Sequence, residues 1–258
     1  MKNELWILYL NLSRNNDNYL SHEPVWGSMA VIAVKIGGSV LAPETIDLVY
    51  AKRISKMLLD IIKAGKHQLF VVVGGGKLAR RYIDACRALG ANESYLDEVG
   101  IEGSRMNARV LISALGDAAY HLPAKDFDEA KMAGHKHDIV VMGGTHPGHT
   151  TDAVCAMLSE KVKADRLVIT TNVDGIYTED PKKCKNARLL KHVKPLELMD
   201  LCGKAMGKAG SSGAVDPLAA KIISRSGIPT GVVNGKDIKN VKAAILGKKF
   251  KGTIIGKW

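Results

Sequence analysis

The sequence predicts an α/β protein, a three-layer αβα sandwich around an open, mainly parallel sheet. Three observations indicate this class. Short apolar runs of strand length alternate with amphipathic stretches of helical length. Three of the apolar runs end in glycine-rich loops. The chain has 258 residues, 46% of them hydrophobic, which is enough for one domain with a sizeable core.

The first predicted elements alternate in type. Residues 31–36 form an apolar run of strand length, and residues 46–62 carry apolar side chains mostly at intervals of three, four and seven, the spacing of a helix. Gly65 supplies a stop for that helix. A second strand is expected at 69–73 and a second helix at 77–89. A strand that leads into a helix and then a parallel strand is the unit of a sheet covered on both faces.

The same alternation continues to the C-terminus. A polar stretch follows the second helix, and the chain shows no internal repeat and no low-complexity segment. The remaining predicted elements are helices at 105–115, 152–162, 216–225 and 238–245 and strands at 139–142, 167–170 and 230–233. The sequence therefore predicts one domain over residues 29–258.

Residues 1–28 are expected to be an N-terminal extension that is disordered or not native to the domain. Their short apolar patch, Leu5 to Leu10, is flanked by Glu4 and is followed by no small-residue cleavage site, which argues against a signal peptide. No apolar run in the chain approaches the roughly 18 to 20 residues that a bilayer span requires, so no membrane partner is expected.

The spacing of the cysteines indicates the cellular compartment of the protein. The four cysteines are widely spaced without a C-x-x-C pair, which favours a reducing, cytoplasmic location over a disulfide framework or a zinc knuckle.

The positive charge is concentrated in the C-terminal part of the chain. Residues 182–258 hold 17 Lys and Arg against 4 Asp and Glu, whereas the chain as a whole has a formal charge of +11. This positive part is either a solvated surface or an attractor of anionic ligands such as nucleotides. Nucleic acid is not the expected partner, because aromatic residues make up only 5% of the chain and none gathers among the basic residues.

Glycine-rich loops follow three of the predicted strands. The first loop is Lys35-Ile36-Gly37-Gly38-Ser39, the second is Gly74-Gly75-Gly76, and the third runs from Gly143 to Asp152. In open α/β sheets, ligands bind beyond the carboxyl ends of the strands. Backbone without Cβ atoms lets N–H groups approach an anion, and a helix that follows adds a favourable dipole. Three such loops at one edge predict a site for several phosphates.

Two other phosphate-binding motifs fit the chain less well than these three loops. The chain lacks the G-x-x-x-x-G-K-[ST] pattern of a Walker-type loop. Residues 74–79 do fit the G-x-G-x-x-A pattern of a dinucleotide-binding protein, which leaves an NAD-dependent oxidoreductase as an alternative. That fold needs an acidic residue about 20 positions later at the end of a strand. Here Glu93, Asp97 and Glu98 instead precede a helical pattern.

Three charged residues are the candidate catalytic groups, because phosphoryl transfer requires two anions to be aligned and their charge neutralised. Lys35 is the only charge in an apolar strand-to-loop run. Lys221 is expected near the start of a helix that faces the same edge. Asp152 follows the third loop at a helix start, where it either caps the helix or orients the lysines or a hydrated magnesium ion.

The histidines of the third loop are expected to bind substrate. His146 and His149 are three residues apart, with His135 and His137 nearby, but no cysteine or carboxylate is spaced to complete a tetrahedral zinc set. The sequence therefore predicts no metal site made by the protein alone.

Five segments of the chain resemble the amino acid kinase superfamily and, within it, the archaeal type of uridylate (UMP) kinase. The segments are VKIGGSVL at 34–41, VVVGGGKLARRYI at 71–83, MGGTHPGHTTDAV at 142–154, TNVDGIYTEDPKK at 171–183 and KAGSSGAVDPLAAKII at 208–223. The third segment is specific to the archaeal type. The resemblance extends over about residues 30–256, and residues 1–28 have no counterpart in it.

The resemblance implies a kinase that converts ATP and UMP to ADP and UDP with magnesium, usually as a hexamer. It implies that Gly38, Ser39, Gly76 and Arg80 contact ATP phosphates and that Thr171, Asn172, Tyr177 and Asp180 bind the ATP base and ribose. On the acceptor side it implies that UMP is bound by Gly75, Asp97, Thr145, His146, Pro147, Gly148, His149, Thr150 and Thr151.

Two alternatives stay open within the superfamily. An isopentenyl phosphate kinase would use a histidine in the second glycine loop, and GGGKLARR contains none. A storage or sensory protein would keep the fold and bind nucleotide without turnover.

Overall fold

The chain folds around a mainly parallel sheet. The structure is a computed structural model that describes residues 29–65, 67–206 and 215–258. In this part of the chain the sheet has seven strands in the order β3-β2-β1-β4-β6-β7-β5. Their bounds are β1 Val31–Ile36, β2 Gln68–Val73, β3 Ile139–Met142, β4 Arg166–Thr171, β5 His192–Val193, β6 Thr230–Asn234 and β7 Thr253–Ile255.

Strand β1 marks the place where the chain changes direction across the sheet. It pairs in parallel with β2 on one side and with β4 on the other. The chain first builds outward through β2 and β3, and then crosses back to β4 and β6. Among the described strands the one antiparallel pairing is that of β6 with β7, and β5 runs parallel to β7. The carboxyl ends of β1, β2, β3 and β4 therefore lie at one edge, where such a change of direction opens a crevice for a ligand.

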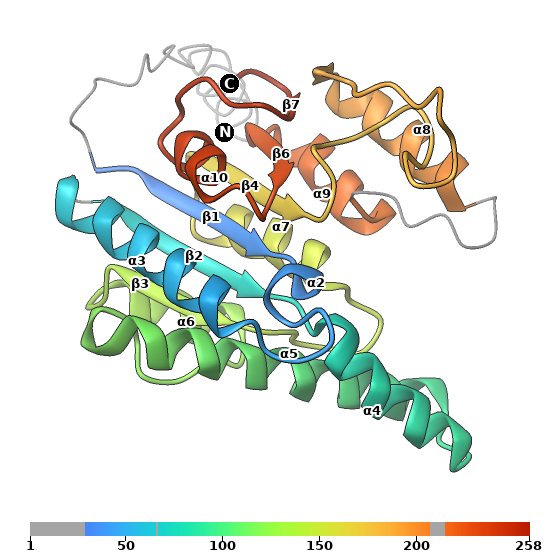
Figure 1. Cartoon of the computed structure of the whole chain (residues 1–258). Coiled ribbons are helices and arrows are strands. Elements are labelled where there is room, and N and C mark those ends of the chain that lie inside the picture. The colour runs from blue at the N-terminus through green and yellow to red at the C-terminus, as the bar shows by residue number, and fades with distance from the viewer. Residues whose placement is uncertain (1–28, 66, 207–214) are drawn as a thin grey trace, which may run out of the picture.

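Helices cover both faces of the sheet (Figure 1). One apolar cluster joins the sheet to α3, α5 and α10, and a second joins it to α6, α7, α8 and α9. Within β1, Val34 belongs to the first cluster and Ala33 to the second. The helices are α2 Gly38–Leu41, α3 Leu48–Ala64, α4 Gly76–Ala88, α5 Glu93–Leu115, α6 Phe127–Gly134, α7 Thr151–Lys161, α8 Pro195–Met206, α9 Pro217–Ser226 and α10 Ile238–Ile245.

The predicted fold class is confirmed, and the structure also adds elements. Every predicted strand and helix is present, with ends that differ by a few residues except at α5. Elements α2, α6, α8, β5 and β7 were not predicted from the sequence. The predicted extension at residues 1–28 lies outside the described residues. Within the described residues, no helix is both long and apolar enough to cross a bilayer.

Helix α5 corrects the predicted start of the helix at residues 105–115, because it begins twelve residues earlier, within the polar stretch. The helix begins at Glu93, where the Asn92 side chain accepts a hydrogen bond from the Tyr95 N–H at 2.9 Å. Its two glycines weaken the helical pattern of the sequence, but they allow α4 to pack closely. A Cβ atom on Gly103 would lie 2.6 Å from the Ala79 Cβ.

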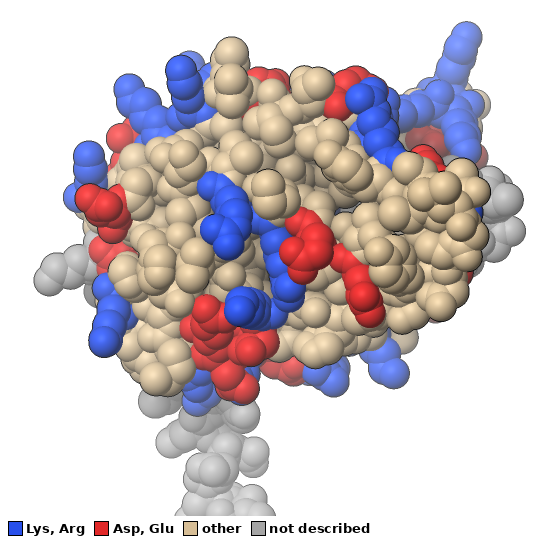
Figure 2. Space-filling view, turned by 90° about the horizontal axis from the view of Figure 1, so that it is seen from below, with Lys and Arg blue, Asp and Glu red and all other residues tan. Residues whose placement is uncertain are grey.

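Charged residues of both signs share the surface that faces downward in Figure 1. On this face, blue basic and red acidic side chains lie next to one another on a largely uncharged background (Figure 2). On this face the basic side chains do not form a continuous stripe.

Candidate active site

The first two glycine loops touch each other at the carboxyl edge of the sheet. A Cβ atom on Gly38 would lie 2.1 Å from the Gly76 nitrogen and 2.6 Å from the Gly74 oxygen, so no larger residue fits there. Gly76 also has a φ of +68°, in the left-handed region that glycine adopts without strain. Both loops lead directly into helices, α2 and α4. Several unpaired N–H groups at two helix starts therefore lie side by side, which is the arrangement that binds phosphate.

Strand β4 holds the first loop from its other side. The Gly37 N–H donates to the buried Thr170 hydroxyl at 3.1 Å. The third loop approaches as well, because a Cβ atom on Gly74 would lie 3.3 Å from the Thr151 Oγ1. The three loops that the sequence predicted to converge therefore meet in the structure.

Lys35 and Asp152 form an ion pair where these loops meet. The Lys35 Nζ lies 2.6 Å from the Asp152 Oδ1, and the two side chains are only 13% and 16% exposed. Lys35 extends from β1 toward α7, because it has the same strand parity as Ala33, which packs in the cluster that includes α7. Apart from the ion pair, Asp152 Oδ1 has no hydrogen bond among the described residues. The Lys35 ammonium group thus lies between the phosphate-binding edge of the sheet and the Asp152 carboxylate.

Asp152 is not the cap of α7. The Thr150 hydroxyl takes that role and accepts from the Ala153 N–H at 3.1 Å, while Asp152 lies in the first turn. One turn further into the helix is Cys155. Burial raises the pKa of its thiol, and the negative charge of Asp152 acts in the same direction. Cys155 is therefore a neutral packing group beneath the ion pair.

Lys221 takes a different position from Lys35. It lies in α9, is exposed, and makes no hydrogen bond or ion pair with Lys35 or Asp152 within residues 29–65, 67–206 and 215–258. The start of α9 is nevertheless tied to the start of α7. Asp216 caps α9 by accepting from the N–H groups of Leu218 and Ala219 at 2.8 and 3.1 Å, and its other oxygen accepts from the Thr150 hydroxyl.

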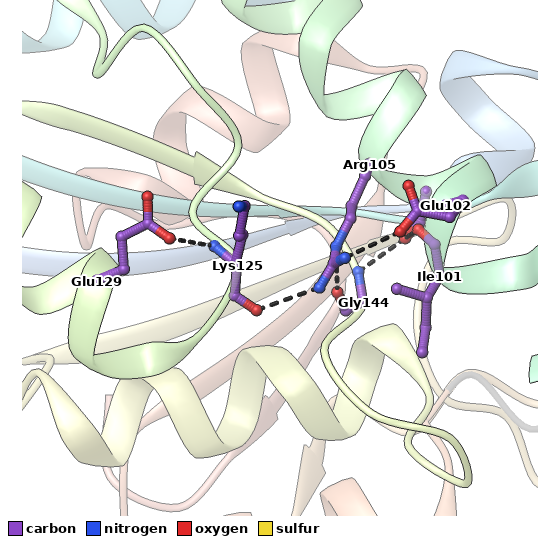
Figure 3. A network of polar contacts seen from close by, with 7 residues as sticks. Ile101, Glu102, Arg105, Lys125, Glu129 and Gly144 are labelled. Atoms are coloured by element: carbon purple, nitrogen blue, oxygen red, sulfur yellow. Dashed lines mark hydrogen bonds and ion pairs between the residues drawn. The ribbon is translucent and has the colours of Figure 1, made fainter. Parts of the chain in front are cut away.

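The third loop is clamped at its beginning by α5 (Figure 3). The Gly144 N–H donates to the Ser104 hydroxyl at 2.7 Å, and the Arg105 Nε donates to the Gly144 oxygen at 3.2 Å. Arg105 also donates to the Lys125 oxygen at 3.2 Å and forms an ion pair with Glu102 at 2.9 Å. Helix α5 therefore holds both the N–H and the C=O of Gly144.

Further along the loop, two buried polar atoms have no partner among the described residues. They are Thr145 Oγ1 and His149 Nδ1. Asp97 of α5 supports the loop between them, because its Oδ2 accepts from the Gly148 N–H at 2.7 Å. Unpaired buried polar atoms are costly in an empty site and are common where a ligand completes the bonding.

The loop histidines lie near each other, with ring centroids of His146 and His149 6.1 Å apart. The described part of the chain contains no group of three His, Cys, Asp or Glu side chains arranged to hold a metal ion. Both rings belong to the same loop as Thr145, so they can contact a ligand bound to that loop.

The remaining predicted site residues follow β1, β2 and β4 along the chain. Ser39, Arg80 and Asn172 are exposed, whereas Thr171 at the end of β4 is half-buried. Tyr177 is bridged to Leu189 through the backbone. The Asp180 Oδ1 accepts from the Lys182 N–H at 2.9 Å and so stabilises the turn that follows.

Asp174 is a support for the loop after β4. The Asn234 side chain at the end of β6 donates to its Oδ1 at 3.0 Å, and the Lys251 Nζ lies 2.6 Å from its Oδ2. The hydrogen bonds from Lys251 and Asn234 lower the pKa of Asp174. A cavity of about 460 Å³ lies beside it, and Asp174 and Asp237 offset part of the basic charge of its lining.

Four supporting residues were not found from the sequence: Ser104, Arg105, Asn107 and Asp216. Asp216 carried a usable signal, because an acidic residue directly before Pro217 is typical of a helix start. Ser104 and Asn107 also have a recognisable pattern in the sequence. They are polar residues on the face of α5 that carries Leu111, spaced at helical intervals.

Comparison with known proteins agrees with this geometry. The sequence model of the amino acid kinase family matches residues 30–234, which is most of the chain. The chain belongs to the amino acid kinase family. Uridylate kinases of Thermococcus gammatolerans and Methanocaldococcus jannaschii are each 46% identical to it, and each alignment covers 87% of this chain and 98% of the relative.

Two solved structures are similar to this chain in fold. The crystal structure of uridylate kinase from Archaeoglobus fulgidus has a TM-score of 0.78 and 41% identity, and the match covers 88% of this chain and 100% of that one. A structure of isopentenyl phosphate kinase has a TM-score of 0.66 at 19% identity and so shares the fold alone. The resemblance read from the five sequence segments is thus confirmed.

Proposed function

We propose that this amino acid kinase is a UMP kinase, which transfers the γ-phosphoryl group of ATP to UMP and releases ADP and UDP for pyrimidine nucleotide synthesis. The observation that supports it most is the Lys35–Asp152 ion pair, placed where three glycine loops meet. Relatives named uridylate kinase match the chain over nearly their whole length.

The donor occupies the side of the site formed by β1, β2 and β4. The N–H groups of Gly38, Ser39 and Gly76, with the side chain of Arg80, hold the ATP phosphates. Thr171, Asn172, Tyr177 and Asp180 hold the base and ribose. The free N–H groups at the starts of α2 and α4 support this assignment, since they supply partial positive charge without mobile side chains.

The acceptor occupies the loop that runs from β3 to α7. Gly75 and Asp97 lie at its border, and the loop itself contributes Thr145, His146, Pro147, Gly148, His149, Thr150 and Thr151. The unpartnered Thr145 hydroxyl and His149 nitrogen support this assignment, because UMP carries polar groups that can complete their bonding.

In the reaction, a phosphate oxygen of UMP attacks the γ-phosphorus of ATP, and the bond from that phosphorus to the β,γ-bridging oxygen breaks. Lys35 Nζ neutralises charge that develops on the transferred group, and Asp152 positions Lys35. Lys221 is the third catalytic group of this proposal. It approaches from α9, whose start Asp216 ties to Thr150.

Magnesium accompanies ATP in this proposal. The ion binds few protein carboxylates and keeps several waters, so Asp152 and the phosphates form a sufficient oxygen donor set. Asp152 has a second carboxylate oxygen besides the Oδ1 that pairs with Lys35, and that oxygen fits this role. When bound, magnesium neutralises the charge of the phosphates.

We further propose that the enzyme works in the cytoplasm as a homo-oligomer, a hexamer by resemblance to its relatives. The four free cysteines support a reducing compartment. A groove of about 780 Å³ between α3 and α5, bordered by the exposed Leu48 and Met106, supports self-association. Light scattering after size-exclusion chromatography measures the number of subunits.

Product identification tests the reaction. The chain is incubated with magnesium, UMP and ATP labelled with ³²P at the γ position, and the products are separated by chromatography. We expect the label in UDP, with one ADP formed for each UDP. Label in inorganic phosphate alone would contradict phosphoryl transfer to UMP.

A further inference from the structure

Asn107 holds two successive carbonyl groups of the second glycine loop. It lies on α5 and is 2% exposed. Its Nδ2 donates one hydrogen bond to the Gly74 oxygen and another to the Gly75 oxygen, each at 2.9 Å. Both protons of the amide group are therefore used on the loop.

These two bonds fix the direction of the N–H groups on the same peptides. In a planar trans peptide the C=O and the N–H point in opposite directions. With the carbonyls of Gly74 and Gly75 directed toward α5, the N–H groups of Gly75 and Gly76 are directed away from it. Within the described residues neither N–H donates a hydrogen bond, and Gly76 is the first residue of α4.

We propose that Asn107 is a positioning residue, which orients the peptide groups of Gly75 and Gly76 so that their N–H groups face the phosphates of the bound nucleotide. This inference rests on the proposed function, because it takes the anion to be a kinase substrate. Glycine peptides rotate easily, and a reversed peptide would present a carbonyl oxygen to the phosphate. Two donors on one side chain prevent both reversals.

The same face of α5 also sets the third loop. Ser104 lies one turn before Asn107, and its hydroxyl accepts from the Gly144 N–H. Residues three apart on a helix are neighbours on its surface. One rigid helix thus fixes the second loop through Asn107 and the third loop through Ser104, which sets the spacing between donor and acceptor.

The sequence offers a direct probe of these peptides. Among its 26 glycines, only Gly38, Gly75, Gly76 and Gly144 follow another glycine. In protein labelled with 1-¹³C,¹⁵N-glycine, an NMR experiment that requires a ¹³C–¹⁵N bond therefore reports these amides alone. We expect the Gly76 signal to shift when ATP and magnesium are added to the wild-type protein, and the Gly75 signal to shift when UMP is added. In Asn107→Asp these two shifts are lost or reduced, while the Gly144 signal of the free protein stays in place.

A pH profile separates positioning from simple structural loss. The Asn107→Asp carboxylate cannot donate, so kcat/KM should fall on the order of 10²-fold near pH 8, as for other lost positioned donors. Burial raises the pKa of a carboxyl group. As the pH falls through that pKa, the carboxylic acid regains one O–H donor, and part of the activity should return. The wild type should show no such rise toward acid.

Gln68→Glu is the matched control. The Gln68 Nε2 also donates to two backbone oxygens, those of Gly134 and His137. It lies at the start of β2, at the opposite end of the strand from the second glycine loop, so its loss should leave kcat/KM and the Gly-Gly signals unchanged.

A wild-type Gly76 signal that does not respond to ATP and magnesium, together with a Gly75 signal that does not respond to UMP, would overturn the proposal. So would a folded Asn107→Asp with wild-type kcat/KM and wild-type shifts. If that variant does not fold, Asn107→Ser, which keeps one donor, should show an intermediate loss, and full activity in it would count against the proposal. If UMP is not phosphorylated but the Gly76 amide responds to ATP in an Asn107-dependent way, the acceptor assignment fails and the positioning role stands.

Discussion

At the scale of single residues, the site depends on the Lys35–Asp152 pair. The sequence identified Lys35 as the only charge in an apolar run and Asp152 as a polar residue after a glycine loop. Their contact could not be predicted, because it depends on β1 and α7 lying against each other although they are more than a hundred residues apart. For the same reason Asn107 was missed, since a mid-helix asparagine shows its partners only once α5 is placed.

Replacing Lys35 by Met should lower kcat on the order of 10²-fold or more and change KM for ATP much less. A charge that acts mainly on the transition state affects turnover more than binding. Steady-state kinetics with ATP and UMP measure both constants. Wild-type kcat in this variant would remove Lys35 from the mechanism.

A double variant separates the loss of turnover from a loss of stability. Lys35→Met leaves Asp152 without its partner in a largely buried position, which lowers the free energy of unfolding. Lys35→Met with Asp152→Asn removes the unpaired charge. We expect the double variant to melt at a higher temperature than Lys35→Met and to stay inactive.

Thr145→Val should raise KM for UMP and leave KM for ATP nearly unchanged. The hydroxyl that it removes has no partner in the described structure, so we expect it to form a hydrogen bond with the acceptor. Because valine has the same shape, the melting temperature should stay the same or rise. Equal losses of UMP and ATP binding would contradict an acceptor role.

Asp97→Ala is the companion to this variant. It removes the acceptor of the Gly148 N–H in the third loop and should also raise KM for UMP selectively.

At the scale of elements, α5 shows how far the sequence could be read. Its second half was predicted from apolar periodicity, whereas its first half contains Gly100 and Gly103, which pack against α4 and obscure the helical pattern. The three glycine loops were predicted to converge, because parallel strands end at a common edge. The supports of those loops came only from the structure.

Asp216→Ala should destabilise the protein by about 1 kcal/mol, the usual cost of losing a helix cap. It should also raise KM for UMP, because Asp216 accepts from the Thr150 hydroxyl of the third loop. Asp237→Ala is the control, since Asp237 caps α10 by accepting from the Asn240 N–H at 3.1 Å. Denaturant unfolding and kinetics together test the pair. A similar rise in KM for both variants would mean that the effect is only one of stability.

At the scale of the whole molecule, the order of strands and helices followed from alternation along the sequence. Strands β5 and β7 did not, because two and three residues are too few to show a period. Their pairing depends on neighbours distant in the chain, such as Gly231 with Ile254. The domain boundary at residue 29 stays a prediction, and the family match begins at residue 30.

A chain that begins at Met29 should fold and turn over substrate like the full chain. The first core strand starts at Val31, and the segment before it has no periodic apolar face. Thermal unfolding and kcat of the two chains provide the comparison. A loss of several degrees in melting temperature would show that residues 1–28 contribute to the domain.

The most direct test of the proposed function is a comparison of phosphoryl acceptors. ADP release is measured with magnesium, ATP and, in turn, UMP, CMP, AMP, dUMP and isopentenyl phosphate. A site built to hydrogen-bond one acceptor rejects others that leave its buried groups unpaired. We expect the highest kcat/KM with UMP. A value for AMP or isopentenyl phosphate equal to or above that of UMP would contradict UMP as the acceptor, and ATP binding without turnover of any of the five would contradict a kinase.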